Sequence, residues 1–461
     1  MLDPHIFRAY DIRGVAHDQI TEEACLLIGR AFGSELRERY SSSSPRVAVG
    51  RDARTHSPAF EEATIAGLKA AGCAVLRIGQ TPSPMNYFTI CTENLDGSVQ
   101  VTASHNPPED NGIKLQIRDA EAFAGDDLQR LFTRIQAQKF LDGTGSEEQF
   151  DAVTPYLGKL GTMFHGIGTG LHVVIDAGNG VAGPAYATAL RNTGCQLTEL
   201  YTEPDGTFPN HPADPSKPDT LIDLQAKVQE VQANCGFAFD GDGDRLGVTD
   251  EHGTIRAADE ILLLLARDHL SRHAGAPVIF TVSNSGILET EIATWGGKPI
   301  MCKVGHSFVE HTMRKHKAQL GGEQSGHFFC KEDYYGFDDA LVASLRVLQI
   351  LSRADAPLSS LFAAFPKVFR APELRPFCPD DRKTAIVKRT TEHFQQEGHP
   401  VSTLDGARVD FGSGAWAGIR QSNTSPRLSI VLEARSQQKL EVVKNTVLAH
   451  LKTYPEIDFQ R

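Results

Sequence analysis

The feature that most constrains the fold is a repeated order of short apolar segments, glycine-containing turns and amphipathic segments. In the first 140 residues, helical spacing over 22–40 and 59–73 alternates with strand-like segments over 46–52, 74–79 and 97–104. Regular alternation of strands and helices is typical of an α/β sheet whose helices cross from one strand to the next.

This order restarts twice further along the chain. Residues 170–195 and 276–297 each give an apolar strand, a glycine-containing turn and a helix. A chain of 461 residues is too long for a single hydrophobic core. We therefore predict three related α/β domains with mixed sheets, which we interpret as internal repeats.

The last 95 residues or so differ from the rest. A helical pattern within 375–398 is followed by two strands, at 414–420 and 427–434, and by a helix over 436–454. Leu428, Ile430 and Leu432 alternate with more polar positions, which predicts a smaller α+β domain with an antiparallel sheet. The expected domains are 1–149, 150–253, 254–366 and 367–461.

Composition narrows the class of protein. The net charge of −12 argues against a general nucleic-acid binder. A small anion would need a few placed Arg and Lys residues and backbone amides. No apolar run is long enough for a membrane span and no signal core is present, and the eight cysteines show no CxxC pair. These features predict a cytoplasmic protein with reduced thiols and no membrane partner.

The strongest chemical signal is the segment CGFAFDGDGDRLGVTD at 235–250. An apolar strand leads into Asp240, Asp242 and Asp244, which are separated by glycines. Three close carboxylates repel one another unless a cation joins them, and oxygen ligands suit Mg²⁺, Ca²⁺ or Mn²⁺. An EF-hand is an alternative, but Arg245 occupies the position of its invariant glycine, and a strand precedes the loop instead of a helix. A plain surface turn is the other alternative.

The segment VTASHNPPEDNGIK at 101–114 places Ser104 at a predicted strand end, before two prolines. A serine held still with its hydroxyl exposed can act as a nucleophile, although such a serine can also belong to an ordinary turn. With a metal triad elsewhere in the chain, phosphoryl transfer through Ser104 becomes the favoured chemistry, and Arg245 could bind the anion.

Three further polar segments are candidates for binding. GGEQSGHF at 321–328 offers Glu323, Ser325 and His327, which could read sugar hydroxyls. RQSNTSP at 420–426 offers Arg420, Ser422, Asn423 and Thr424, which suit a phosphate that does not react. FRAYDIRG at 7–14 and VGHSF at 304–308 contribute Tyr10, Arg13 and His306. His269 and His273 have helical i,i+4 spacing, and we assign them no role.

Together these residues resemble the α-D-phosphohexomutase family, and within it the phosphomannomutase/phosphoglucomutase group. Seven segments occur in the family's order over nearly the whole chain: FRAYDIRG, TASHNPPEDNGIK, DAGNG, DGDGDR, VGHS, GGEQSGH and RQSNTSP. The resemblance implies four domains around a central cleft. It also implies a reversible exchange between hexose 1-phosphate and hexose 6-phosphate, through phosphorylated Ser104 and a hexose 1,6-bisphosphate intermediate that also serves as activator.

The resemblance assigns a role to each matching residue. Ser104, Asp240, Asp242 and Asp244 would hold one Mg²⁺ per chain. Arg245 would contact the reacting phosphate, and Arg13, Lys114 and His306 would lie near the reacting groups as candidates for acid–base work. The substrate-binding residues would be Tyr10, His105, Glu323, Ser325, His327, Arg420, Ser422, Asn423 and Thr424. The partners would be small hexose phosphates, and nothing in the sequence demands an oligomer.

Two positions depart from the mannose/glucose enzymes. Ser283 stands where a lysine is common, and Gln324 stands where Met is often found, so that GGEQSGH also fits phosphoglucosamine mutases. RQSNTSP matches the mannose/glucose group, and we favour those sugars. The alternatives are a phosphoglucosamine mutase, a serine-dependent phosphomonoesterase and a non-catalytic sugar-phosphate-binding protein.

Overall fold

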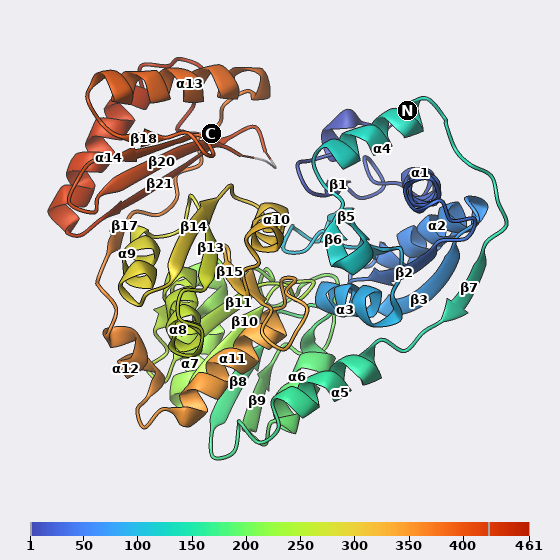
Figure 1. Ribbon diagram of the computed structural model, residues 1–461, viewed down its shortest axis with the longest axis horizontal. Coiled ribbons are helices and arrows are strands. Elements are labelled where there is room, and N and C mark those ends of the chain that lie inside the picture. Colours follow the sequence, from blue (N-terminus) through green and yellow to red (C-terminus); the bar gives the residue numbers. More distant parts are fainter. Residues whose placement is uncertain (1, 423–424, 461) are drawn as a thin grey trace. The chain divides into compact units, whose positions relative to one another are not determined.

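The computed structural model describes residues 2–422 and 425–460 of the chain (Figure 1). These residues divide into two compact units. The first unit comprises Met1–Leu265 with Ser325–Phe362, and the second comprises Ala266–Gln324 with Ala363–Arg461. The division falls inside helix α8 (Ala258–Arg272).

The first sheet has strand order β1-β5-β4-β2-β3-β7, with β6 beside β5. Its strands are β1 (Ile12–Val15), β2 (Arg46–Arg51), β3 (Ala74–Gln80), β4 (Gly97–Val101), β5 (Asp110–Ile117), β6 (Glu121–Ala122) and β7 (Ser146–Gln149). β2 pairs in parallel with β3 and β4, whereas β5 is antiparallel to β1 and β4. The sheet is therefore mixed, as the sequence predicted.

Helices cover both faces of this sheet (Figure 1). They are α1 (Glu22–Tyr40), α2 (Ser57–Ala70), α3 (Ser83–Glu93) and α4 (Asp126–Gln136). Phe32 of α1 and Leu68 of α2 share one buried core with Val49 and Val99 of the strands. On the opposite face, Asn86 of α3 donates to Gln100 of β4. Thr21 begins α1 by accepting a hydrogen bond from the amide of Ala24, as an N-cap residue should.

The second sheet has strand order β12-β11-β10-β8-β9 and also lies in the first unit. Its strands are β8 (His172–Asp176), β9 (Gln196–Leu200), β10 (Cys235–Phe239), β11 (Leu246–Asp250) and β12 (Ile255–Arg256). β8 pairs in parallel with β9 and β10, and β11 returns antiparallel to β10. The same unit contains α5 (Val153–Met163), α6 (Gly183–Asn192), α7 (Ile222–Glu230), β16 (Phe328–Cys330), α11 (Ala340–Arg353) and most of α12 (Leu358–Ala363).

In the second unit, β13 (Pro277–Thr281) pairs in parallel with β14 (Lys298–Cys302) and β15 (Leu320–Gly322). Helices α9 (Gly286–Thr294) and α10 (His306–His316) follow β13 and β14 along the chain. The strand, turn and helix that the sequence predicts over 276–297 are therefore present as β13 and α9.

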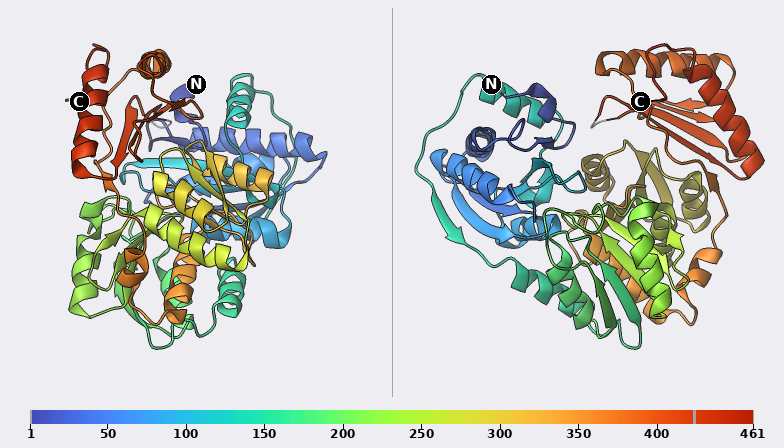
Figure 2. Two further views of the ribbon diagram at one scale, coloured as in Figure 1. Left: turned by 60° about the vertical axis from the view of Figure 1, so that its left-hand side comes forward. Right: turned by 180° about the vertical axis from the view of Figure 1, so that it is seen from behind.

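The last sheet is antiparallel throughout, as expected. Its order is β17-β21-β20-β19-β18, formed by β17 (Phe369–Arg370), β18 (Val401–Ser402), β19 (Ala407–Asp410), β20 (Trp416–Gln421) and β21 (Leu428–Ala434). Figure 2 shows α13 (Asp380–Gln396) and α14 (Gln437–Leu451) packed against this sheet. Leu428, Ile430 and Leu432 enter the core with these helices, whereas Glu433 lies on the other face.

Among the described residues, no helix combines the length and apolar character that crossing a membrane would require. The eight cysteines are present as thiols, and seven of them are buried. Within the part of the chain that the structure describes there are also three short 3₁₀ helices: η1 (Pro4–Ile6), η2 (Arg118–Ala120) and η3 (Pro218–Leu221).

Candidate active site

Ser104 lies in a strained turn, not at the end of a strand. β4 ends at Val101, so the predicted strand over 97–104 is too long. Ser104 has a φ of 52°, a left-handed conformation that is uncommon for a residue other than glycine. Its amide donates to Thr102 Oγ1 at 2.8 Å, and its carbonyl accepts from Arg54 Nη2 at 2.9 Å. These contacts maintain a backbone conformation that is unfavourable for an isolated serine.

Asp240, Asp242 and Asp244 lie in the turn between β10 and β11. Gly243 supplies a φ of 79°, and a Cβ on Gly241 would lie 2.4 Å from the carbonyl oxygen of Ser104. Only glycine therefore allows the two loops to approach so closely. Asp240 Oδ1 accepts three amide hydrogen bonds, from Gly243, Asp244 and Arg245. A β-hairpin carries this loop, which excludes an EF-hand.

The three carboxylates and the serine meet at one buried point. Ser104 Oγ donates to Asp240 Oδ2 at 2.6 Å. Lys114 Nζ donates to Asp242 Oδ2 at 2.7 Å and to Asp244 Oδ2 at 2.5 Å, and Ser83 Oγ also donates to Asp242 Oδ2. One ligand oxygen from each aspartate can be chosen so that all three lie within 4.8 Å of one another.

This donor set fits a divalent cation. Asp242 Oδ1 and Asp244 Oδ1 are buried and accept no hydrogen bond from the described residues. Burial and the neighbouring charges of Asp244 and Asp242 raise the pKa of Asp240 well above its usual range. A hard cation would fill the open acceptor sites and remove the repulsion between carboxylates.

Arg245 is oriented by a histidine and an aspartate. Its Nε donates to His327 Nε2 at 3.0 Å, and His327 Nδ1 lies 2.8 Å from Asp338 Oδ2. Accepting at Nε2 places the imidazole proton on Nδ1, where it faces Asp338. The pKa of Arg245 is raised, because the charges of Asp240, Asp214 and Asp244 outweigh the effect of its burial. The arginine therefore presents a fixed positive charge beside the carboxylates.

Arg13 connects the N-terminal segment to the serine turn. Its Nη2 lies 2.7 Å from Asp11 Oδ2, and its Nη1 donates to Ala103 O and Asn106 Oδ1, each at 3.2 Å. Tyr10 is half-buried on the same segment. His105 Nδ1 lies 3.2 Å from Ser104 Oγ, and burial with the charges of Arg245 and Arg13 lowers the pKa of this histidine well below its usual range.

The predicted sugar-binding segment is divided between the units. Ser325 and His327 belong to the first unit and Glu323 to the second. Glu323 Oε1 accepts from the amide of Gly305 at 2.7 Å, immediately before His306 at the start of α10. Glu323 and His306 are both buried, and this contact joins the two predicted segments inside the second unit.

Ser283, which stands where a lysine is common in the mannose/glucose enzymes, is largely buried in the turn after β13. Its carbonyl accepts from Arg370 Nη2 at 2.8 Å, and the carbonyl of Asn284 accepts from Arg408 Nη1. Arg370 and Arg408 come from the C-terminal antiparallel sheet. Arginine side chains of one sheet therefore bind backbone carbonyls of a turn that follows a strand of the other sheet, and both sheets belong to the second unit.

The predicted phosphate-binding segment, 420–426, begins in the last two residues of β20 and continues beyond it. Arg420 is half-buried near the end of that strand. Ser422 Oγ accepts from Arg375 Nη2 at 3.0 Å, and Lys383 Nζ donates to the carbonyls of Ser422 and Ser425. The predicted binding residues Asn423 and Thr424 lie outside the residues that the structure describes.

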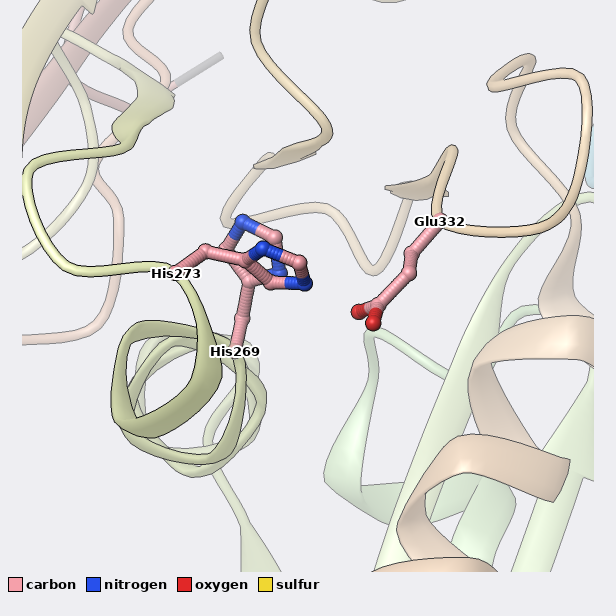
Figure 3. A group of neighbouring side chains, drawn as sticks. All are labelled: His269, His273 and Glu332. Atoms are coloured by element: carbon pink, nitrogen blue, oxygen red, sulfur yellow. The ribbon is translucent and has the colours of Figure 1, made fainter.

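His269 and His273 lie side by side at the C-terminal end of α8, with ring centroids 4.7 Å apart (Figure 3). Glu332, the third side chain drawn there, belongs to the other unit, and we assign no site to the three.

Several residues that hold the site were not anticipated from the sequence. Arg54 and Ser83 contact predicted site residues from distant parts of the chain, and Asp338 contacts His327 from the next loop along. For Arg54, a signal was available, because GRDAR places charged residues directly after a buried strand.

Comparison with known proteins extends these observations over the whole chain. Four family signatures match. Domain I of phosphoglucomutase/phosphomannomutase matches residues 4–142, domain II 156–253, domain III 257–369 and the C-terminal domain 362–450.

Individual relatives match over nearly their full length. The chain is 41% identical to a phosphomannomutase/phosphoglucomutase of Pseudomonas aeruginosa, covering 98% of this chain and 96% of the relative. It is 38% identical to a phosphoglucomutase of Neisseria gonorrhoeae, with 98% of each chain covered. A crystal structure of a family protein from Burkholderia thailandensis superimposes with a TM-score of 0.92 at 38% identity, covering 100% of both chains.

Proposed function

Because this chain belongs to the phosphoglucomutase/phosphomannomutase family, we propose that it is a phosphohexomutase that reversibly interconverts hexose 1-phosphate and hexose 6-phosphate. The observation that carries the proposal is the buried contact between Ser104 Oγ and Asp240 Oδ2 at 2.6 Å, within a cluster of three carboxylates. A hydroxyl aimed at a cation site is suited to carry a phosphoryl group.

The proposed reaction has two transfers that mirror each other. Phosphorylated Ser104 gives its phosphoryl group to the free hydroxyl of a hexose phosphate. The P–O bond to Ser104 breaks, a P–O bond to the sugar forms, and the proton of the sugar hydroxyl passes to a basic side chain, for which His306 is the candidate. The resulting hexose 1,6-bisphosphate turns around, and its other phosphoryl group returns to Ser104. The same bisphosphate would activate unphosphorylated enzyme.

Asp240, Asp242 and Asp244, with an oxygen on Ser104, would hold one Mg²⁺, which supplies charge neutralisation for the transferring group when bound. Lys114 bridges Asp242 and Asp244, and their charges raise its pKa well above its usual range despite burial. Lys114 therefore already offsets part of the negative charge of the cluster.

The positive side chains around Ser104 would bind the reacting phosphate. Arg245, fixed by His327, and Arg13, fixed by Asp11, present planar guanidinium groups suited to phosphate oxygens. Arg13 keeps its charge at any relevant pH, so we assign it to binding phosphate instead of moving a proton. Of the two sequence-based candidates for proton transfer, Lys114 also stays charged because its pKa is raised, so we assign it to charge neutralisation and keep His306 as the candidate. Tyr10 and His105 remain the candidates for contacting substrate.

The sugar and the second phosphate would contact the remaining segments. Glu323, Ser325 and His327 would read the sugar hydroxyls, and Arg420 and Ser422, with Asn423 and Thr424, would hold the phosphate that does not react. The RQSNTSP segment favours mannose and glucose phosphates. A phosphoglucosamine mutase is the alternative, and relative rates on the three sugar phosphates would decide between them.

We also propose the four domain boundaries 1–149, 150–253, 254–366 and 367–461, a monomer acting on small hexose phosphates, and a cytoplasmic location. The presence of the cysteines as thiols supports a reducing compartment. The net charge of −12 supports the absence of a nucleic-acid partner.

The test is intact mass and peptide mapping of the protein before and after incubation with Mg²⁺ and glucose 1,6-bisphosphate, followed by each hexose 6-phosphate. A phosphoryl group on Ser104 that exchanges with the sugar phosphates is expected. Unmodified Ser104 would overturn the proposal, and stoichiometric release of inorganic phosphate would favour a phosphomonoesterase.

A further inference from the structure

The turn that carries Ser104 is held by one buried arginine, Arg54. This side chain is only 1% exposed, and all five of its N–H groups are used. Nε donates to Asp52 Oδ2 at 3.1 Å. The other four donate to backbone carbonyls of the turn, those of Ser104, Asn106, Pro107 and Asp110.

The four carbonyls belong to a single segment of seven residues, 104–110, in which the first six lie outside regular strands and helices and Asp110 begins β5. The carbonyl of Pro107 also accepts from the amide of Asp110, and Arg54 supplies a donor to each of the four carbonyls. The bond to the Ser104 carbonyl, at 2.9 Å, acts on the residue whose φ is 52°. Arg54 therefore fixes both ends of the turn and the strained residue within it.

Arg54 is itself held on several sides. Asp52 Oδ1 accepts from Ser57 Oγ and from the Arg54 amide, so the carboxylate cannot rotate away. The ring of Phe208 lies 5.2 Å from the guanidinium carbon. A Cβ on Gly206 would lie 2.5 Å from Arg54 Cα, so the segment that carries Phe208 is pressed against the arginine. These contacts restrict the guanidinium to the orientation in which it binds the turn.

We propose that Arg54 is a positioning residue for phosphoryl transfer. Its hydrogen bonds to the backbone carbonyls of the turn set the direction of the Ser104 hydroxyl. The proposal rests on the proposed function of Ser104 as phosphoryl carrier. Arg54 touches neither the carboxylate cluster nor Ser104 Oγ through any hydrogen bond found among the described residues. Its effect should therefore fall on the rate of transfer and leave substrate binding unchanged.

Lysine provides the decisive substitution. Arg54→Lys keeps the positive charge beside Asp52, but its three donors sit on one nitrogen and cannot span four carbonyls. Misplacing a reacting atom by about 1 Å can cost about a hundredfold in rate, so we expect kcat to fall by about that factor with an unchanged KM. Single-turnover phosphorylation of Ser104 by glucose 1,6-bisphosphate should slow by the same factor.

Arg37→Lys is the matched control. Arg37 Nη1 also donates to two backbone carbonyls, those of Ala71 and Asp142, in the same unit but away from the serine turn. Its kcat should equal that of the wild type. If Arg54 served only as an ion-pair partner of Asp52, Arg54→Lys would retain wild-type kcat, and that result would overturn the proposal.

A second variant covers the case in which Arg54→Lys does not fold, as judged by circular dichroism. Asp52→Asn leaves Arg54 in place and weakens its anchoring, and we expect kcat to fall about tenfold with an unchanged KM. Wild-type kcat in this folded variant would overturn the proposal. Failure of wild-type Ser104 to become phosphorylated would instead overturn the proposed function, so the two failures are distinguishable.

Discussion

Two loops that the sequence marked for phosphate chemistry are built in different ways. Ser104 is buried within its turn, and the carbonyls, amide and hydroxyl there are bound by Arg54, Thr102 and Asp240. The other loop begins at the end of β20 with a half-buried Arg420, and its buried Ser422 accepts a hydrogen bond from Arg375, which is exposed. A buried cation holds each loop, but Arg54 binds four carbonyls of the first, whereas Lys383 binds two carbonyls of the second. In addition, the hydroxyl of the first loop's serine is bound by a buried carboxylate.

This difference corresponds to two tasks. Transfer of a phosphoryl group needs atoms held within a fraction of an ångström, which buried hydrogen bonds provide. Holding a phosphate that does not react needs charge and donors, and tolerates more freedom. Substitutions in the first loop should therefore change kcat, and those in the second should change KM.

The largest effect is expected for Ser104→Ala. Removal of the proposed phosphoryl carrier should lower kcat by at least about a thousandfold, and no phosphorylated protein should appear in the mass spectrum. Ser98→Ala, a buried serine of β4 in the same sheet, is the control and should retain activity. Substantial conversion of hexose 1-phosphate by Ser104→Ala would contradict the assignment of phosphoryl transfer to the first loop.

A somewhat smaller effect is expected for Asp242→Asn. The variant keeps the shape of the side chain but removes one charge from the cluster, so Mg²⁺ affinity should fall by roughly a hundredfold or more. Calorimetric titration with Mg²⁺ measures this directly. Asp176→Asn, which alters a buried aspartate at the end of β8, should bind Mg²⁺ as the wild type does. Equal affinity in the two variants would contradict a metal site at 240–244.

Arg420→Ala tests the second loop. Loss of a charged hydrogen bond worth about 1.5–3 kcal/mol should raise KM by about tenfold to a hundredfold with little change in kcat. Arg375→Ala should have a smaller effect on KM, because Arg375 donates to Ser422 Oγ and orients the loop. An unchanged KM in Arg420→Ala would remove the phosphate-binding role of this segment.

The pH dependence of stability should distinguish the units. Burial raises the pKa of Asp339 to about 6, despite hydrogen bonds from Val342, Tyr334 and Tyr156. The folded state then binds the proton more tightly than the unfolded chain does. The contribution of Asp339 to the free energy of unfolding should therefore fall as the pH rises from about 4 to about 6. Over this range Asp339→Asn should gain in melting temperature relative to the wild type, and a constant difference would contradict the shift.

The smallest effect is expected at His450 in the second unit, with the opposite sign. Burial and the charge of the stacked His393 lower the pKa of His450 to about 4. The unfolded chain binds this proton more tightly, so the contribution of His450 should fall as the pH decreases from about 6.5 to about 4. His450→Gln should gain relative to the wild type on acidification, which differential scanning calorimetry can measure. A gain in the stability of His450→Gln relative to the wild type as the pH rises would contradict this prediction.

Much of the fold and part of the site could be predicted from local pattern. The predicted helix at 22–40 is present as α1 with the same bounds, and the antiparallel C-terminal sheet is confirmed. The carboxylate loop was also predictable, because an apolar strand followed by alternating Asp and Gly fixes both its position and its close spacing. The four family domains confirm the predicted fold class.

The sequence by itself therefore determined the α/β alternation, the three aspartates and the serine, because each depends on residues that are neighbours in the chain. Only the tertiary structure decided that Lys114 bridges Asp242 and Asp244, that Asp338 orients His327, and that Arg54 holds the serine turn. Lys114 and Asp242 are 128 positions apart. The physical reason is that side-chain periodicity encodes the local backbone, whereas pairing of distant buried charges depends on which strand ends the topology brings together.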